Sequence, residues 1–219
     1  MRALLVPCLA FCSLWLSGCE VVYSVDSLNN KEDAVEEPAI TGTWSPGENS
    51  TDRLCIEKSD GNTYNMVITS SDSDSVDDSK SAKKPQEVVV YQLTLVRLDD
   101  QLFADMVFKE QALNGTKIEP PAGTIFHHVI VKLNLTDTDL GYSVLDDYAI
   151  REAKEQGYAP LSYVEVSDGI LLIASTEDLR WSVSHYADRL FKDWDHFRRV
   201  TYNSADGSPQ KPCNAIQSP

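Results

Sequence analysis

Alternating apolar and polar residues run through the middle of the chain and predict β-strands. A period of two recurs in six runs, at 53–58, 64–68, 87–98, 101–108, 125–135 and 139–145. Two shorter runs at 163–166 and 170–174 have the same character. Turn residues such as Asp60-Gly61 and Asp99-Asp100 stand between consecutive runs, as expected for antiparallel hairpins.

Two segments have helical signals instead. Asp146 or Asp147 can cap a short helix that runs to 156 and stops at Gly157. Ser175 followed three positions later by Asp178 resembles a capping box. Apolar residues then recur at three- and four-residue steps: Leu179, Val183, Tyr186, Leu190 and Trp194. The second helix is therefore predicted to lay this apolar stripe on the sheet.

These elements define the expected fold class, which is mainly antiparallel β with about eight strands and two helices. The longer helix is C-terminal and packs on the sheet. The strands suit either an open sheet or sandwich, or a lipocalin-like barrel. The helix at 147–156 interrupts a simple up-and-down order, so both arrangements stay open.

The first residues form an apolar leader. Met1-Arg2 carries one positive charge, and residues 3–16 are almost wholly apolar. This run is shorter than the roughly 20 residues that a bilayer-spanning helix needs. A charged start, a short apolar stretch and small residues before a cleavage point are typical of an export signal, here predicted over residues 1–18.

The end of the leader, Leu16-Ser17-Gly18-Cys19, resembles a bacterial lipobox. The resemblance implies cleavage before Cys19 and lipid on that cysteine, and two or more acyl chains anchor a protein stably. Glu20 stands where an Asp would signal inner-membrane retention, so the implied location is the bacterial cell envelope, at the outer membrane. The alternative is an ordinary secretory signal followed by an incidental cysteine.

Composition shifts predict the domain organisation. Residues 19–39 are rich in charge and poor in sustained apolar pattern, and we expect a lipidated Cys19 followed by an acidic flexible tether. Residues 40–203 form a single β-rich domain, and 204–219 form a C-terminal tail. Within the domain, 70–86 is a low-complexity acidic run that predicts a disordered loop rather than a calcium loop, because Val76 falls where an oxygen ligand belongs.

Charge and cysteines narrow the possibilities. The net charge is −15, and removal of residues 1–18 takes away one basic residue, Arg2, to leave −16. Such a chain repels phosphate backbones, so nucleic acid is not an expected partner. Besides the leader cysteines and Cys19, Cys55 and Cys213 remain, and in an oxidising compartment we expect them to form a disulfide.

The domain also resembles a family of uncharacterised bacterial lipoproteins. The shared features are Gly42 and Trp44, Pro121 with His127, then 176–179 and 197–199. The resemblance implies no activity. Gly-x-Trp also opens lipocalins, in which a late basic residue packs over the Trp; Arg198 or Arg199 is expected to do so here through a cation–π contact.

No catalytic or metal-ligating motif stands out. On a strand, His127 falls with the apolar face and His128 toward solvent. No cofactor or metal is expected, and the protein is predicted not to be an enzyme. We predict a membrane-anchored, non-enzymatic interaction module that contacts an envelope protein. The alternatives are a lipocalin-like carrier of a small apolar or amphipathic ligand, and a hydrolase that uses His127 or His185.

Overall fold

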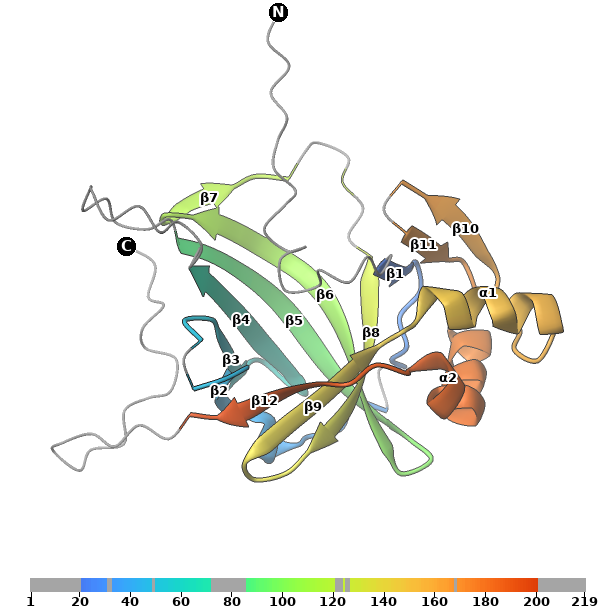
Figure 1. Cartoon of the computed structure of the whole chain (residues 1–219), viewed down its shortest axis with the longest axis horizontal. Helices are drawn as coiled ribbons and strands as arrows, with labels where there is room; N and C mark the ends of the chain where they lie inside the picture. The colour runs from blue at the N-terminus through green and yellow to red at the C-terminus, as the bar shows by residue number, and fades with distance from the viewer. Residues whose placement is uncertain are drawn as a thin grey trace, which may run out of the picture.

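A closed, eight-stranded antiparallel β-barrel forms the centre of the structure (Figure 1). The computed structural model describes residues 21–30, 33–48, 50–71, 86–120, 124, 127–167 and 169–200. The barrel strands are β2 (Gly42–Ser45), β3 (Arg53–Lys58), β4 (Thr63–Ser71), β5 (Gln86–Leu98), β6 (Gln101–Leu113), β8 (His128–Leu135), β9 (Asp139–Val144) and β12 (Asp195–Arg199).

Pairing between β6 and β8 closes the ring. The remaining neighbours follow the order β8, β9, β12, β2, β3, β4, β5 and β6, and the last of these pairs with β8 from Leu102↔Leu133 to Val107↔His128. Of the two arrangements that the sequence left open, the structure therefore has the lipocalin-like barrel. Full closure leaves the barrel itself without an unpaired edge strand.

The segment between β9 and β12 does not break the barrel, because it leaves and returns at neighbouring strands. It contains α1 (Asp147–Gln156), β10 (Tyr163–Val166), β11 (Gly169–Leu172) and α2 (Thr176–Leu190). Strand β12 then inserts between β9 and β2, with Phe197 opposite Leu140 and Arg199 opposite Trp44. The helix that was predicted to interrupt the strand order thus lies in a long connection between two neighbouring barrel strands.

Both helices begin where the sequence indicated. The side chain of Asp146 accepts a hydrogen bond from the backbone N–H of Ala149 at 2.6 Å, and α1 stops at Gly157 with φ of 68°. Ser175 accepts from the N–H of Asp178 at 3.2 Å and caps α2. The predicted extension of this helix to Trp194 is wrong, because α2 ends at Leu190 and the chain is then non-helical until β12 begins at Asp195.

Two apolar cores lie on either side of the barrel wall. One lies inside the barrel, and its fully buried members include Trp44, Tyr64 and Leu93. The other lies between the outer face of the wall and the helices, where Phe103 of β6 and Ile130 of β8 meet the apolar stripe of α2. The longer helix therefore packs on the sheet, as predicted.

The prediction of a flexible tether over 19–39 is wrong for the part of that range that the structure describes. Residues Val21–Ser24 form β1, which runs parallel to β11 and meets β8 where Ser24 pairs with His128. Leu28 is fully buried, and Arg180 of α2 holds its carbonyl oxygen at 3.1 Å. Few apolar residues suffice here because Val22, Leu28 and Ile40 are buried in the two existing cores.

Charged residues of this segment form ion pairs with the barrel and with α2, so its charge-rich composition does not make it a free tether. Asp33 lies 3.0 Å from Arg180, and Glu37 lies 3.3 Å from Arg97. The segment ends in a 3₁₀ turn, Pro38–Ile40, that leads into β2. Another strand that the sequence did not predict, β7 (Thr116–Ile118), extends the end of β6 as a hairpin.

Several predictions fall outside the described residues: the leader, Cys19, the tail with Cys213, and 72–85 of the acidic loop. The edges of that loop were set too wide, because Ser70 and Ser71 belong to β4 and Gln86 begins β5. The strand predicted to begin at 125 begins at His128. Within the described ranges, no helix is both long and apolar enough to cross a membrane.

Candidate ligand-binding cavity

The barrel encloses a cavity of about 880 Å³ that opens at one end. This volume falls in the range of pockets that hold a small molecule, and an eight-stranded barrel is wide enough for one such ligand. The side chains alternate along each strand, so every second residue points inward. The apolar lining includes Leu54, Ile56, Met66, Ile68, Leu93, Ala104, Met106, Phe108, Val129, Val131, Leu133, Leu140 and Phe197.

Trp44 and Arg199 close the opposite end of the barrel. The guanidinium carbon of Arg199 lies 4.1 Å from the centre of the Trp44 ring, and the indole is fully buried. Arg199 donates through Nη1 to the carbonyl of Thr41 at 2.7 Å and through Nε to the carbonyl of Asp137 at 2.6 Å. One side chain therefore joins the β8–β9 turn to the chain that enters β2.

Gly42 makes this arrangement possible. Its φ is +140°, and a Cβ at this position would lie 2.6 Å from Nη1 of Arg199. A side chain on residue 42 would push the guanidinium away from the indole. Of the two arginines named from the sequence, the structure places Arg199 over Trp44, whereas Arg198 is exposed on the next position of β12.

A hydrogen bond also holds the indole of Trp44 in place. Its Nε1 donates to the carbonyl of Ile40 at 3.0 Å, so the indole has no unsatisfied polar atom at this site. Ile40 comes from the 3₁₀ turn, is fully buried and contributes to the cavity lining. Ile40 therefore lies at the floor of the cavity, and the indole, which does not itself line the cavity, is bonded to the same turn.

The open end carries aromatic residues from three different parts of the chain. Tyr23 of β1 lies 5.8 Å from His127, measured between ring centres, and both line the cavity. Tyr91 packs edge-on against Phe108 at 5.9 Å. Burial is the main cause that raises the pKa of Tyr91, and the nearby Tyr23 adds to it. The phenol of Tyr91 therefore stays neutral and keeps its proton.

The charged residues of the described lining are mostly acidic. They are Asp52, Asp146, Asp147, Asp193 and Asp195, with Arg53 as their basic counterpart. Arg53 is held by the hydroxyl of Ser45 at 3.0 Å. Burial, and then the carboxylate of Asp195, raise the pKa of Tyr142, which donates a hydrogen bond to that carboxylate. Asp146 is paired with Lys192 at 3.7 Å and Asp147 with Arg151 at 3.6 Å. The acidic character of the lining therefore comes mainly from Asp52, Asp193 and Asp195. These carboxylates disfavour an anionic group in the cavity.

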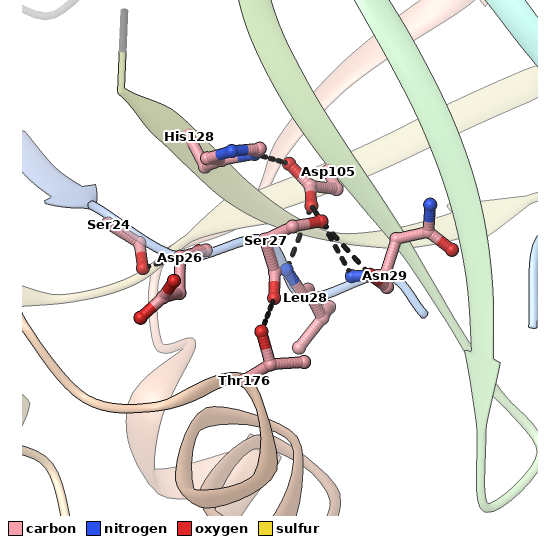
Figure 2. A network of polar contacts seen from close by, with 8 residues as sticks. All are labelled: Ser24, Asp26, Ser27, Leu28, Asn29, Asp105, His128 and Thr176. Carbon is pink, nitrogen blue, oxygen red and sulfur yellow. Dashed lines mark hydrogen bonds and ion pairs between the residues drawn. The ribbon is translucent and has the colours of Figure 1, made fainter. Parts of the chain in front are cut away.

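A second polar site lies on the outer face of the barrel wall (Figure 2). Asp105 of β6 is only 3% exposed, and its Oδ1 lies 2.6 Å from Nδ1 of His128. Its Oδ2 accepts hydrogen bonds from the hydroxyl of Ser27 and from the N–H of Leu28 at 2.8 Å. Thr176 of α2 donates to the carbonyl of Ser27 at 2.8 Å. This network fastens the N-terminal segment to the barrel and to α2.

The sequence predicted that His128 faces solvent, but its ring is not freely exposed. It does point to the outside of the barrel, but the segment after β1 covers that surface and Asp105 binds the ring. The hydrogen bond to Asp105 is the main cause that raises the pKa of His128, and partial burial acts in the opposite direction.

The order of this network differs from that of a Ser-His-Asp triad. In a triad the histidine stands between the serine and the aspartate, so that it can take the serine proton. Here Asp105 stands between Ser27 and His128. Of the two histidines considered for hydrolysis, His127 lines the barrel cavity, whereas His185 is exposed and stacks on Trp181 at 4.5 Å between ring centres.

The remaining candidate residues have simple placements. Cys55 is buried on β3, between Leu54 and Ile56, which point into the barrel. Its predicted partner, Cys213, lies outside the described residues, so the disulfide stays a prediction. Among the described residues, no group of three or more His, Cys, Asp or Glu side chains is placed to hold a metal ion.

Comparison with known proteins returned no match. No protein-family model matches the chain, and neither the curated proteins nor the solved structures contain a match to it. The resemblance to bacterial lipoproteins and lipocalins therefore stays a prediction from short motifs. What the structure defines is a class, a closed β-barrel with a ligand-sized apolar cavity.

Two residues of these sites were not expected from the sequence. Tyr23 lies in the range that was interpreted as a tether, so no role was assigned to it. Asp105 had a weak signal, because it is the one charged residue in the apolar run 102–108. A charge in such a run favours a buried, hydrogen-bonded role, but its partners come from residues 27, 28 and 128 and only the fold brings them together.

Proposed function

We propose that this protein is a lipid-anchored envelope protein that carries one amphipathic molecule in its barrel. The observation that carries the proposal is the cavity of about 880 Å³ with its apolar wall. Burying an acyl chain there gains about 25 cal/mol for each Å² of apolar surface removed from water. The cavity favours the carrier over the interaction module that the sequence ranked first.

The charges at the cavity support a particular class of ligand. Its described lining has five aspartates and one arginine, and only Asp146 and Asp147 are paired with a nearby Lys192 or Arg151. An acyl chain with a neutral, zwitterionic or cationic head is therefore favoured over a fatty-acid carboxylate. The polar groups among the lining, including Tyr23 and His127, offer hydrogen bonds to such a head. The chain would occupy the barrel between Phe108 and the floor at Ile40.

Membrane anchoring is the second part of the proposal, and its support is the Leu16–Cys19 motif. The lipid on Cys19, with Glu20 after it, supports placement at the outer membrane of a bacterial cell. After a high-salt wash, the protein is expected to stay with membranes and a Cys19→Ser variant to be released. A Cys19→Ser variant that stays bound would contradict the anchor.

Ligand binding is tested with the chain from Glu20 onward and a fluorescent lysophosphatidylcholine. We expect saturable binding of one probe per protein, displaced by an alkylamine and not by the matching fatty acid. Ala104→Trp fills the cavity from β6 and is expected to weaken binding at least about tenfold, which corresponds to about 1.4 kcal/mol. Ala104→Leu, a smaller change, is expected to weaken binding less.

Gln92→Trp is the matched control. Gln92 follows Tyr91 on β5, and its neighbours in sequence, Tyr91 and Leu93, line the cavity while Gln92 does not. This variant adds the same side chain to the outer face and is expected to bind the probe normally. Equal binding by folded Ala104→Trp, or no binding by the unchanged protein, would overturn the carrier proposal.

A further inference from the structure

The predicted anchor is separated from the barrel by a single residue. Only Glu20 stands between Cys19 and Val21, the first residue of β1. Because an extended chain spans at most about 3.6 Å per residue, the Cα atoms of Cys19 and Val21 lie within about 7 Å of each other. The membrane that the lipid on Cys19 enters must therefore lie close to β1.

Strand β1 itself is held firmly in the fold. Each of its four residues pairs with β11, from Val21↔Gly169 to Ser24↔Leu172. Val22 is buried, and a Cβ on Gly169 would lie 2.0 Å from the carbonyl oxygen of Val21, so the two strands approach closely only because residue 169 is a glycine. The position of Val21 relative to the barrel is therefore fixed.

Val21 lies at the opening of the cavity. The first three residues of β1, Val21, Val22 and Tyr23, all contribute to the cavity lining. Tyr23 is near His127 and Tyr91, which stand at the same opening. The closed end, where Arg199 covers Trp44, lies at the opposite end of the barrel strands.

Exposed apolar side chains surround this opening. In Figure 1, β7, β1 and β10 all lie at the upper end of the molecule. Ile118 of β7 is 42% exposed and Leu113, at the end of β6, 44% exposed. On β10, Val164 is 43% and Val166 38% exposed, and Val166 also lines the cavity. Exposed apolar side chains gathered at one place mark a surface that contacts a membrane or another protein.

We propose that the lipid on Cys19 holds the opening of the barrel against the bilayer, so that the cavity exchanges its ligand directly with that membrane. The proposal rests on the carrier function proposed above and assigns the ligand to the acyl lipids of the membrane. The partner surface is zwitterionic, because the acidic lining and the mature net charge of −16 would repel anionic lipids. Ile118, Leu113, Val164 and Val166 are the residues that enter the lipid surface.

The test uses the full acylated protein in phosphatidylcholine vesicles. An insert of about twelve Gly and Ser residues between Glu20 and Val21 adds a random coil that spans roughly 20 Å. We expect it to slow the uptake of a fluorescent lysophosphatidylcholine from the same vesicle about tenfold, because the effective concentration of the opening at the membrane falls with linker length. The same insert placed after Pro219 leaves the anchor unchanged and is expected to have no effect.

Contact with the bilayer is measured separately with a fluorophore on a single introduced cysteine. Brominated phosphatidylcholine is expected to quench the fluorophore at Ile118→Cys but not at Asp60→Cys, which lies in the β3–β4 turn at the closed end. The insert after Glu20 should abolish this difference. Quenching at both positions, or at neither, would overturn the orientation.

The two proposals fail in distinguishable ways. If the protein binds the probe in solution but the insert changes neither uptake nor quenching, membrane loading is wrong and the carrier function stands. If the fluorophore at position 118 is quenched but the protein binds no probe, either in solution or in vesicles, the carrier function is wrong. Loading of the cavity from the membrane is then wrong as well.

Discussion

The carboxylate of Asp105 binds the ring of His128 on the outer face of the barrel, with 2.6 Å between Oδ1 and Nδ1. The two residues belong to neighbouring strands, β6 and β8, at the pairing that closes the barrel. The other oxygen of the carboxylate holds Ser27 and Leu28, which follow β1. One buried charge thus links barrel closure to the docking of the N-terminal segment.

The raised pKa of His128 makes the stability of the protein depend on pH. An unfolded histidine titrates near pH 6.5, and the folded-state pKa lies above that value because of Asp105. The stabilisation is therefore fully present below about pH 6.5 and is lost as the pH rises through the folded-state pKa. Urea unfolding should show a free energy of unfolding that falls over this interval in the unchanged protein and falls less in His128→Gln.

The comparison needs a second histidine variant. His185→Gln removes the same residue type from an exposed position of α2, and we expect its pH profile to match that of the unchanged protein. If His128→Gln and the unchanged protein have parallel profiles, Asp105 does not hold a protonated His128. Asp105→Asn at a fixed pH is expected to cost about 1.5–3 kcal/mol, because hydrogen bonds to a charged group are lost.

Leu28 tests whether the N-terminal segment belongs to the folded domain. Its side chain is fully buried in the core between the barrel wall and the helices. Leu28→Ala should lower the free energy of unfolding by about 2–5 kcal/mol, the usual effect of truncating a buried leucine. Val25→Ala, on a side chain that is 46% exposed, should change it little. Equally small effects of the two substitutions would indicate that this segment is a flexible tether and not part of the folded domain.

Arg199 is expected to stabilise the closed end of the barrel. Arg199→Met keeps much of the side-chain length but removes the cation over Trp44 and the hydrogen bonds to Thr41 and Asp137. We expect a loss of about 1.5–3 kcal/mol in thermal or urea unfolding. Arg198→Met, at the adjacent exposed position, is the control and should be nearly neutral. A neutral Arg199→Met would mean that Trp44 alone closes the barrel.

The predicted disulfide between Cys55 and Cys213 is open to a direct measurement. Alkylation of the exported protein under denaturing conditions should add no mass without reductant and two alkyl groups with it. Reduction is expected to lower the free energy of unfolding by roughly 2–5 kcal/mol, because a long loop is released in the unfolded chain. Two reactive thiols in the unreduced protein would show that Cys55 and Cys213 do not form a disulfide.

Local patterns predicted elements well where the pattern and the tertiary contacts agree. The hairpins around Gly61 and Asp99-Asp100, and the first helix with its Asp146 cap and Gly157 stop, follow from rules that act within a few residues. The strands that were missed are β1, β2, β7 and β12, which are three to five residues long. A strand this short has too few positions for a period, and pairing with a distant partner decides its conformation.

The sequence by itself determined the strand-rich class, the two helix starts, the acidic charge and the Leu16–Cys19 motif, because each is a property of neighbouring residues. Only the tertiary structure decided that the barrel closes, since that depends on β6 meeting β8. It likewise decided that Arg199 rather than Arg198 covers Trp44, and that Asp105, His128 and Leu28 share one network. These relationships join residues far apart in the chain, and no local pattern encodes the distance between them.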